Sequence, residues 1–397
     1  MVKERIDDLV DIIGEEYAML ENTFVIRNNE QLVRYLQNPD EWMTRQMADR
    51  NRYKRRLIMD ARKQIDSLND KVEKVFLLAY KEVDKDIIEI QTNQIVAKDL
   101  PGDAKKQIQE LKQFNAKEVV RLANASYTAY TTQVRIINDI KQVDDFYEVV
   151  KNQMRKGIEN GIKITYSDGK TYSWKSYMEM NIRTTLHQEM TDRQIKIGTK
   201  VGQIFYICDS FADCAPDHAD YQGKIYYNED VDIPNDVMDF INQNGIMSMQ
   251  EVVNNEPFLT SRPNCRHNLH AISMEDVMGG KSAEELTEEK GYKFGEYDQK
   301  NYEALQQQRY NERQIRKYKM RVENNKRIQS ETGVRNILAI KRANNKVKEW
   351  QSKQRELIAN NKGVLERNYQ RESAKTIVQN LGVKYDYKVV DGELIKR

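Results

Sequence analysis

The chain has 397 residues, which is enough for two or three domains and a sizeable buried core. Its 64 lysines and arginines nearly balance 62 aspartates and glutamates, so no overall field draws the whole molecule onto nucleic acid or an anionic membrane. Any such binding must be local. Only 6 prolines and 17 glycines interrupt a sequence that is 32% charged, and the mean hydropathy is -0.82. This composition favours long helices with charged outer faces.

The start of the chain lacks the apolar stretch of a signal peptide, and the longest apolar run, near residues 75–80, is too short to span a bilayer. We therefore expect no membrane segment and a protein that is made in the cytosol. The 3 cysteines, without an export signal, indicate reduced thiols or a metal site rather than a disulfide framework.

Apolar residues recur at intervals of three and four through the first part of the chain, which is the pattern of amphipathic helices. The spacing predicts one helix over residues 2–35 and a second over 40–95, closed by Pro101 and Gly102. The same spacing predicts a single long helix over residues 123–158, ending near Gly157 and Gly161. Residues 1–160 are therefore predicted to form an N-terminal helical region.

The period then changes to the alternation that is typical of strands. Residues 162–174 predict a hairpin around Asp168 and Gly169, followed by a helix over residues 176–197. Strands are predicted at residues 203–209, 224–227 and 267–272, with a small helix at 235–242. Residues 161–280 are therefore expected to form a small α+β domain.

The remainder, residues 281–397, is highly charged and predicts a helical arm. Residues 301–361 read as one or two helices with a weak apolar stripe, which needs a partner to cover it. Residues 383–395 alternate around Asp391 and Gly392 and predict a terminal hairpin. The expected fold is mainly α, with a small central α+β domain between long amphipathic helices.

All 4 histidines and all 3 cysteines lie between His187 and His270. Cys208 sits on an alternating strand and is expected to be a small buried hydrophobe. Four others, Cys214, His218, Cys265 and His267, lie in polar, turn-rich segments and are candidate ligands for Zn²⁺. Their spacing is not that of a zinc finger or ribbon, and a clamp of hydrogen-bonded loops explains the same residues equally well.

Signatures of known enzymes are missing from the sequence. It contains no H-E-x-x-H, G-x-S-x-G, P-loop or G-x-G-x-x-G pattern. His187 and Glu189, followed by Pro263 and Cys265, echo the zinc deaminases, but no second cysteine follows at the required spacing. A dyad of Cys214 and His218 lacks the third group that orients a catalytic base. We therefore expect a protein that is not an enzyme.

A basic stretch at residues 309–327 is the candidate contact for packaged nucleic acid. A solvated face, or an ion-paired helix in an oligomer, is the competing interpretation. The residues that would contact phosphates are Arg309, Arg313, Arg316, Lys317, Lys319 and Arg321.

Two segments carry a resemblance to a known family. The segment Cys214-Ala-Pro-Asp-His218-Ala-Asp-Tyr-Gln-Gly223-Lys-Ile-Tyr226, followed by Pro263-Asn-Cys265-Arg-His267, resembles the phage minor capsid protein family of the minor capsid protein 2 type. That family is related to the Mu F-like head morphogenesis proteins. The helix carrying Arg183 and the charged helix over residues 302–321 are similar in context, so the resemblance covers residues 176–325.

The resemblance implies a virion component made late in infection and assembled in the host cytoplasm, with several copies near the portal vertex. Its implied partners are the portal and other virion proteins, and it implies a role in head assembly and release with the DNA. The residues that match the family pattern, or its upstream context, are Arg183, His218, Gln222, Gly223, Asn264, Cys265, Arg266 and His267. Gly223 is expected to have positive φ, because the chain turns there into a strand.

Three functions therefore remain open. The leading one is a structural minor head protein of a tailed phage. The second is a zinc-dependent enzyme that processes or modifies nucleic acid and is delivered with phage DNA. The third is a plain nucleic-acid-binding protein that uses the basic helix.

Overall fold

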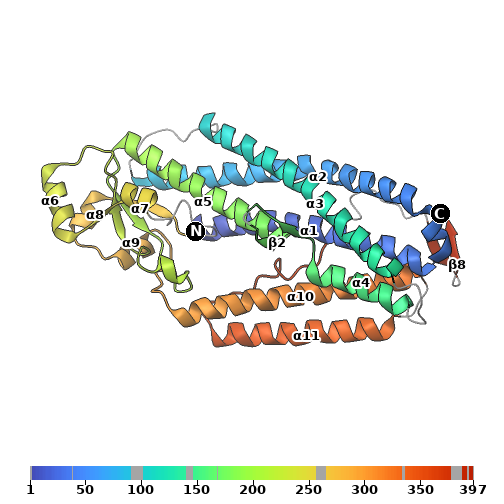
Figure 1. The fold of residues 1–397 in the computed structure, drawn as a ribbon. Coiled ribbons are helices and arrows are strands. Elements are labelled where there is room, and N and C mark those ends of the chain that lie inside the picture. The colour runs from blue at the N-terminus through green and yellow to red at the C-terminus, as the bar shows by residue number, and fades with distance from the viewer. Residues whose placement is uncertain are drawn as a thin grey trace.

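A computed structural model describes residues 2–37, 39–90, 102–139, 146–167, 169–255, 265–332, 336–376, 387–390 and 393–396. Long helices run side by side along one axis of the molecule, and the small sheet with its short helices sits at one end (Figure 1). The predicted fold class, mainly α with a small central α+β part, is confirmed. Within the described residues, none of the helices combines the length and the apolar character that a bilayer-spanning segment needs.

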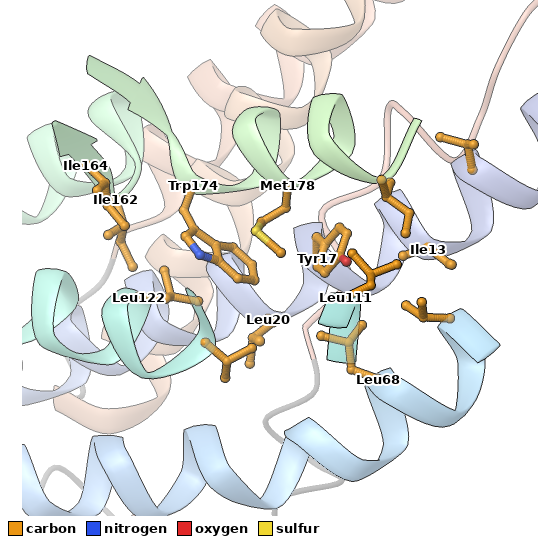
Figure 2. Packing of buried hydrophobic residues seen from close by; sticks show 14 of the residues in the cluster. Ile13, Tyr17, Leu20, Leu68, Leu111, Leu122, Ile162, Ile164, Trp174 and Met178 are labelled. Carbon is orange, nitrogen blue, oxygen red and sulfur yellow. The ribbon is translucent and has the colours of Figure 1, made fainter. Parts of the chain in front are cut away.

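The helical body begins with α1 (Val2–Gln37) and α2 (Pro39–Ile90), followed by α3 (Gly102–Asp139) and α4 (Phe146–Asn160). The predicted apolar stripe of α1 turns inward, since Ile13, Tyr17 and Leu20 are buried. Their side chains meet Trp174 and Met178 of α5 in one packed layer (Figure 2). Tyr17 and Trp174 contact edge to face, with ring centroids 5.5 Å apart.

The prediction of a single helix over residues 123–158 is wrong. The chain forms two helices there, α3 and α4, and they pack against each other. Gln133 on α3 donates a hydrogen bond to the carbonyl of Gln153 on α4 at 2.7 Å. In a continuous helix these two residues would lie roughly 30 Å apart. Burying both apolar faces against α1 stabilises the reversal, and the periodicity does not mark where it occurs.

The predicted hairpin is confirmed as β1 (Lys163–Thr165) paired with β2 (Thr171–Ser173). Ser173 then caps α5 (Trp174–Val201) by accepting from the backbone N–H of Ser176. Glu21 of α1 accepts from the backbone N–H groups of Ile162 at 3.1 Å and Lys175 at 2.9 Å. The hairpin and the start of α5 are therefore fastened to the helical body, and the hydrophobic cluster continues into the central sheet through Tyr206.

The central sheet has the strand order β5-β4-β3-β6. Its members are β3 (Phe205–Cys208), β4 (Ile225–Tyr227), β5 (Met247–Ser248) and β6 (Leu269–Ile272). β3 pairs antiparallel with β4 and with β6, whereas β4 and β5 pair parallel. The short helices around this sheet are η1 (Pro216–His218), α6 (Asn235–Asn244), α7 (Met249–Asn255), α8 (Met274–Met278) and α9 (Ala283–Glu289). The predicted strands and the helix at 235–242 are confirmed, while β5, α7, α8 and α9 were not predicted.

The charged arm forms α10 (Gln299–Thr332) and α11 (Ile337–Asn360), which lie along each other (Figure 1). Tyr310 and Trp350 contact edge to face across them at 5.6 Å, and Ile315 of α10 is fully buried. The weak stripe of this arm is therefore covered partly within the chain. The terminal hairpin is confirmed as β7 (Tyr387–Val390) and β8 (Glu393–Lys396), paired across residues 391–392. The domain boundaries near residues 160 and 280 remain predictions.

Candidate functional site

The segment between β3 and β4 places His218 and Gln222 at one end of the sheet, beyond the last residue of β3. Gly223 closes this segment with φ of +65°, which confirms the expected positive φ. Its N–H donates to the carbonyl of Asp209 at 3.2 Å. A Cβ at this position would meet the ring of Phe294 at 2.9 Å and Oγ of Ser210 at 3.0 Å. Both the backbone conformation and the space therefore require glycine.

Three of the four predicted zinc ligands meet in one group. One ligand atom from each of His218, Cys265 and His267 lies within 4.8 Å of the others, and all three side chains are buried. Sγ of Cys265 lies 3.7 Å from Nδ1 of His267, and the two imidazole rings are 5.1 Å apart. We call these three residues the Cys/His cluster. It joins the helical turn η1 to the segment that leads into β6.

Gln222 determines which nitrogen of His267 faces the cluster. Its Oε1 accepts from the backbone N–H of Phe211 at 2.8 Å, and its Nε2 donates to the carbonyl of Phe211 at 3.1 Å. This double hydrogen bond fixes the amide orientation. Nε2 of His267 lies 2.9 Å from the same Oε1 and must therefore be the donor. The other nitrogen, Nδ1, presents its lone pair toward Cys265.

The other two cysteines have different surroundings. Cys208 is fully buried on β3, as expected for a core residue, and burial raises the pKa of its thiol. Cys214 is also buried but is not a member of the Cys/His cluster, and burial raises its pKa to about 12. Burial lowers the pKa of His218, so its ring is neutral at physiological pH and has a lone pair to offer.

A pocket of about 430 Å³ opens beside the cluster, between the η1 segment and the first turns of α10. His218, His267 and Cys214 line one side, and Tyr302 and Arg309 line the other. Arg266 also lines it, and its Nη2 is buried without a hydrogen-bond partner in the described part of the chain. The same holds for Nε of Arg309. The pocket therefore presents arginine donors next to imidazole nitrogens.

A second polar group lies directly next to the Cys/His cluster, and our sequence analysis did not predict it. The Asp209 carboxylate is 1% exposed and accepts from both nitrogens of Asn268, each at 3.1 Å, and from Nε2 of His270 at 2.7 Å. Nδ1 of His187 lies 3.1 Å from Oδ1 of Asn268. We call these four residues the Asp209 network. Its only sequence signal is an aspartate directly after a buried strand.

The basic residues of α10 lie along the seams between helices. Arg309, Arg313 and Arg316 line a pocket of about 260 Å³ against Lys175 and Arg183 of α5. Partial burial lowers the pKa of Arg313, Lys319 and Arg321, and Arg321 pairs with Glu159 of α4. Lys317 lines the neighbouring pocket at the start of α5. The six residues that were predicted to contact phosphates therefore face other parts of the same chain or lie in pockets between its helices.

Arg183 and Asn264 are the remaining site residues predicted from the sequence. Arg183 is buried in the same seam, 3.7 Å from the carboxylate of Asp11 on α1. Asn264 lies outside the described residues. The structure therefore brings His218, Gln222, Gly223, Cys265, Arg266 and His267 to one end of the sheet. It places Arg183 in the contact between α1, α5 and α10.

A sequence model of one protein family, described as phage minor capsid protein 2, matches residues 2–359. No curated protein and no solved structure matches the chain. The match extends well beyond residues 176–325, on which the resemblance rested, and takes in the helical body, the central sheet and both helices of the arm. The chain belongs to the phage minor capsid protein 2 family.

Proposed function

We propose that this capsid protein acts in head assembly near the portal vertex, in several copies per particle, and that it is assembled in the host cytoplasm. Its proposed partners are the portal and other virion proteins, with packaged DNA as a further contact. The observation that carries the proposal is the family match over residues 2–359, because it includes the helices as well as the Cys/His segment.

The shape of the molecule supports this proposal. Its long helices offer an extended surface for contact with neighbouring virion proteins (Figure 1). Large apolar side chains are exposed at the start of α11, where Ile337 is 58% and Leu338 is 70% exposed. Exposed apolar side chains side by side are typical of surfaces that another protein covers.

Mass spectrometry and asymmetric cryo-EM of purified virions test the proposal. We expect the chain in mature particles, with density that fits the helical body near the portal vertex. A matched particle preparation from a phage with an early stop codon in this gene should lack that density and give fewer filled heads. Absence of the chain from wild-type particles and from assembly intermediates would contradict the proposal.

One observation favours a second function, a zinc-dependent enzyme acting on nucleic acid. The pocket beside the Cys/His cluster holds buried arginine donors from Arg266 and Arg309, which suit phosphate oxygens. An Arg266→Gln variant separates the two functions. An enzyme should lose its activity on DNA while particles still assemble, whereas a purely structural protein should show no DNA turnover in either form.

A further inference from the structure

The Cys/His cluster contains a set of ligand atoms whose chemistry matches one metal ion. It presents a thiol sulfur and two imidazole nitrogens within 4.8 Å of one another. Sulfur and imidazole ligands together suit Zn²⁺, which binds them in tetrahedral geometry, whereas Mg²⁺ and Ca²⁺ prefer oxygen. We propose that His218, Cys265 and His267 bind one Zn²⁺ ion and that Cys214 is not a ligand.

The hydrogen bonds of His267 support this proposal independently of the distances. A histidine that binds a metal through one nitrogen almost always donates its other N–H to a fixed acceptor, which orients the ring. Gln222 is such an acceptor, since Phe211 holds its amide at both ends. The nitrogen left for the metal, Nδ1, faces Cys265. Gln222 is therefore a positioning residue for the metal site.

The surroundings meet two further requirements of a zinc site. The pocket lined by His218 and His267 gives the ion a path from solvent to the ligands. Cys265 is 2% exposed, so its thiolate is shielded from bulk solvent once the ion is bound. When zinc binds, the Cys265 thiol gives its proton to solvent and the sulfur donates its electron pair to the ion. No redox step is involved.

The ion would connect parts of the chain that are far apart in sequence. His218 belongs to the segment between β3 and β4, and the other two ligands precede β6. The same segment is tied to the start of α10, because Asp298 N–H donates to the carbonyl of Ala212 at 2.9 Å and Ser210 Oγ donates to the carbonyl of Gly295 at 2.8 Å. Zinc at this point would join the segment that contacts the start of α10 to the segment that leads into β6.

The test measures zinc bound to the full-length chain, purified under reducing conditions, loaded with zinc and then desalted. We expect about one zinc ion per chain in the wild type and in Cys214→Ser, the matched control with a second buried thiol at the same pocket. His218→Ala, Cys265→Ser and His267→Ala should each bind zinc at least roughly tenfold more weakly. Thermal unfolding should shift upward with zinc in the first two proteins and less in the other three.

A cobalt measurement keeps the proposal testable if a ligand variant does not fold. Co²⁺ added to the wild type should give a thiolate-to-cobalt absorption band, and this band should persist in Cys214→Ser. Loss of the band in Cys214→Ser would overturn the assignment of three ligands in favour of one that includes Cys214. A wild-type chain that takes up neither zinc nor cobalt would overturn the metal site. Neither result depends on whether the chain is found in virions, so failure here is distinguishable from failure of the proposed function.

Discussion

Two groups of buried polar side chains lie at the same end of the central sheet, and they differ in what their atoms face. In the Asp209 network a carboxylate faces three donors from Asn268 and His270. In the Cys/His cluster a sulfur and two imidazoles face one another. In the first group, both oxygens of the Asp209 carboxylate have hydrogen-bond donors from the same chain. The second group brings one sulfur and two imidazole nitrogens close together, and this combination of ligand atoms suits a zinc ion.

Residues 265–270 contribute to both groups, and alternate side chains along this segment belong to different groups. Cys265 and His267 contact each other, whereas Asn268 and His270 contact Asp209. Side chains in an extended chain point alternately to opposite sides. His267 and His270, three residues apart, therefore serve different purposes, which a count of cysteines and histidines does not distinguish.

The largest expected effect is on the Asp209 network. Replacing Asp209 with Asn removes the buried negative charge and turns one acceptor into a donor that faces other donors. We expect the free energy of unfolding to fall by roughly 4 kcal/mol. Urea denaturation measures it, with Asp220→Asn, an exposed aspartate in the same segment, as the control. A loss below about 1 kcal/mol would show that the network is not satisfied as described.

Glu312 is a second buried carboxylate, and it has fewer hydrogen-bond donors than Asp209. It is 3% exposed, and burial raises its pKa to about 7 from an ordinary value of 4.5. The folded state therefore favours the protonated form, so this contribution to stability is full below pH 4.5 and is lost as the pH rises to about 7.

The free energy of unfolding that is lost as Glu312 ionises amounts to at most about 3 kcal/mol. Urea denaturation at a series of pH values measures it. A Glu312→Gln variant should be more stable than the wild type at pH values above that range and should show a flatter pH profile. If the variant had the same dependence of stability on pH as the wild type, Glu312 would not be the group that causes the loss.

A smaller effect is expected at Gln222, which touches the Cys/His cluster only through His267. Gln222→Ala should weaken zinc binding by about tenfold to a hundredfold, because the imidazole loses the acceptor that orients it. Competition with a chelator measures the affinity. Gln306→Ala, on the α10 side of the same pocket, is the control and should bind zinc as the wild type does. Equal affinity in the two variants would mean that the Gln222 contact does not orient the ligand.

The smallest effect concerns Gly223, which follows Gln222 and donates its N–H to the carbonyl of Asp209. Gly223→Ala adds a methyl group against Phe294 and Ser210, whereas Gly245→Ala has the same sign of φ but open space. Positive φ costs each variant roughly 1 kcal/mol, and we expect Gly223→Ala to lose about 1 kcal/mol more. Thermal unfolding of both variants gives the difference. Equal losses would show that the neighbours of Gly223 move aside.

Long periodic segments were predictable from the sequence, whereas the reversal between α3 and α4 was not. In the sequence, the helical spacing of apolar residues continues at Ile140, Val143 and Tyr147, and no proline or glycine lies between the end of α3 and the start of α4. The short helices α8 and α9 contain too few residues for periodicity. Their capping serines, Ser273 and Ser282, were the available signal.

The Cys/His site was predictable as a region, because its residue types are concentrated in one window. The choice of members was not, since Cys214 and Cys265 are alike in sequence and differ only in where the fold places them. The role of Gln222 depends on a contact 45 positions away along the chain, and that of Asp209 on one 61 positions away. Spacing within a motif carries no information about such contacts.

X-ray absorption at the zinc edge of the loaded wild-type protein tests the contrast between the two groups most directly. We expect one sulfur at about 2.3 Å and two imidazole nitrogens at about 2.0–2.1 Å, with any remaining ligand a light atom. Two sulfur ligands would place Cys214 in the site. A shell of oxygen and nitrogen alone would contradict the Cys/His cluster as the metal centre.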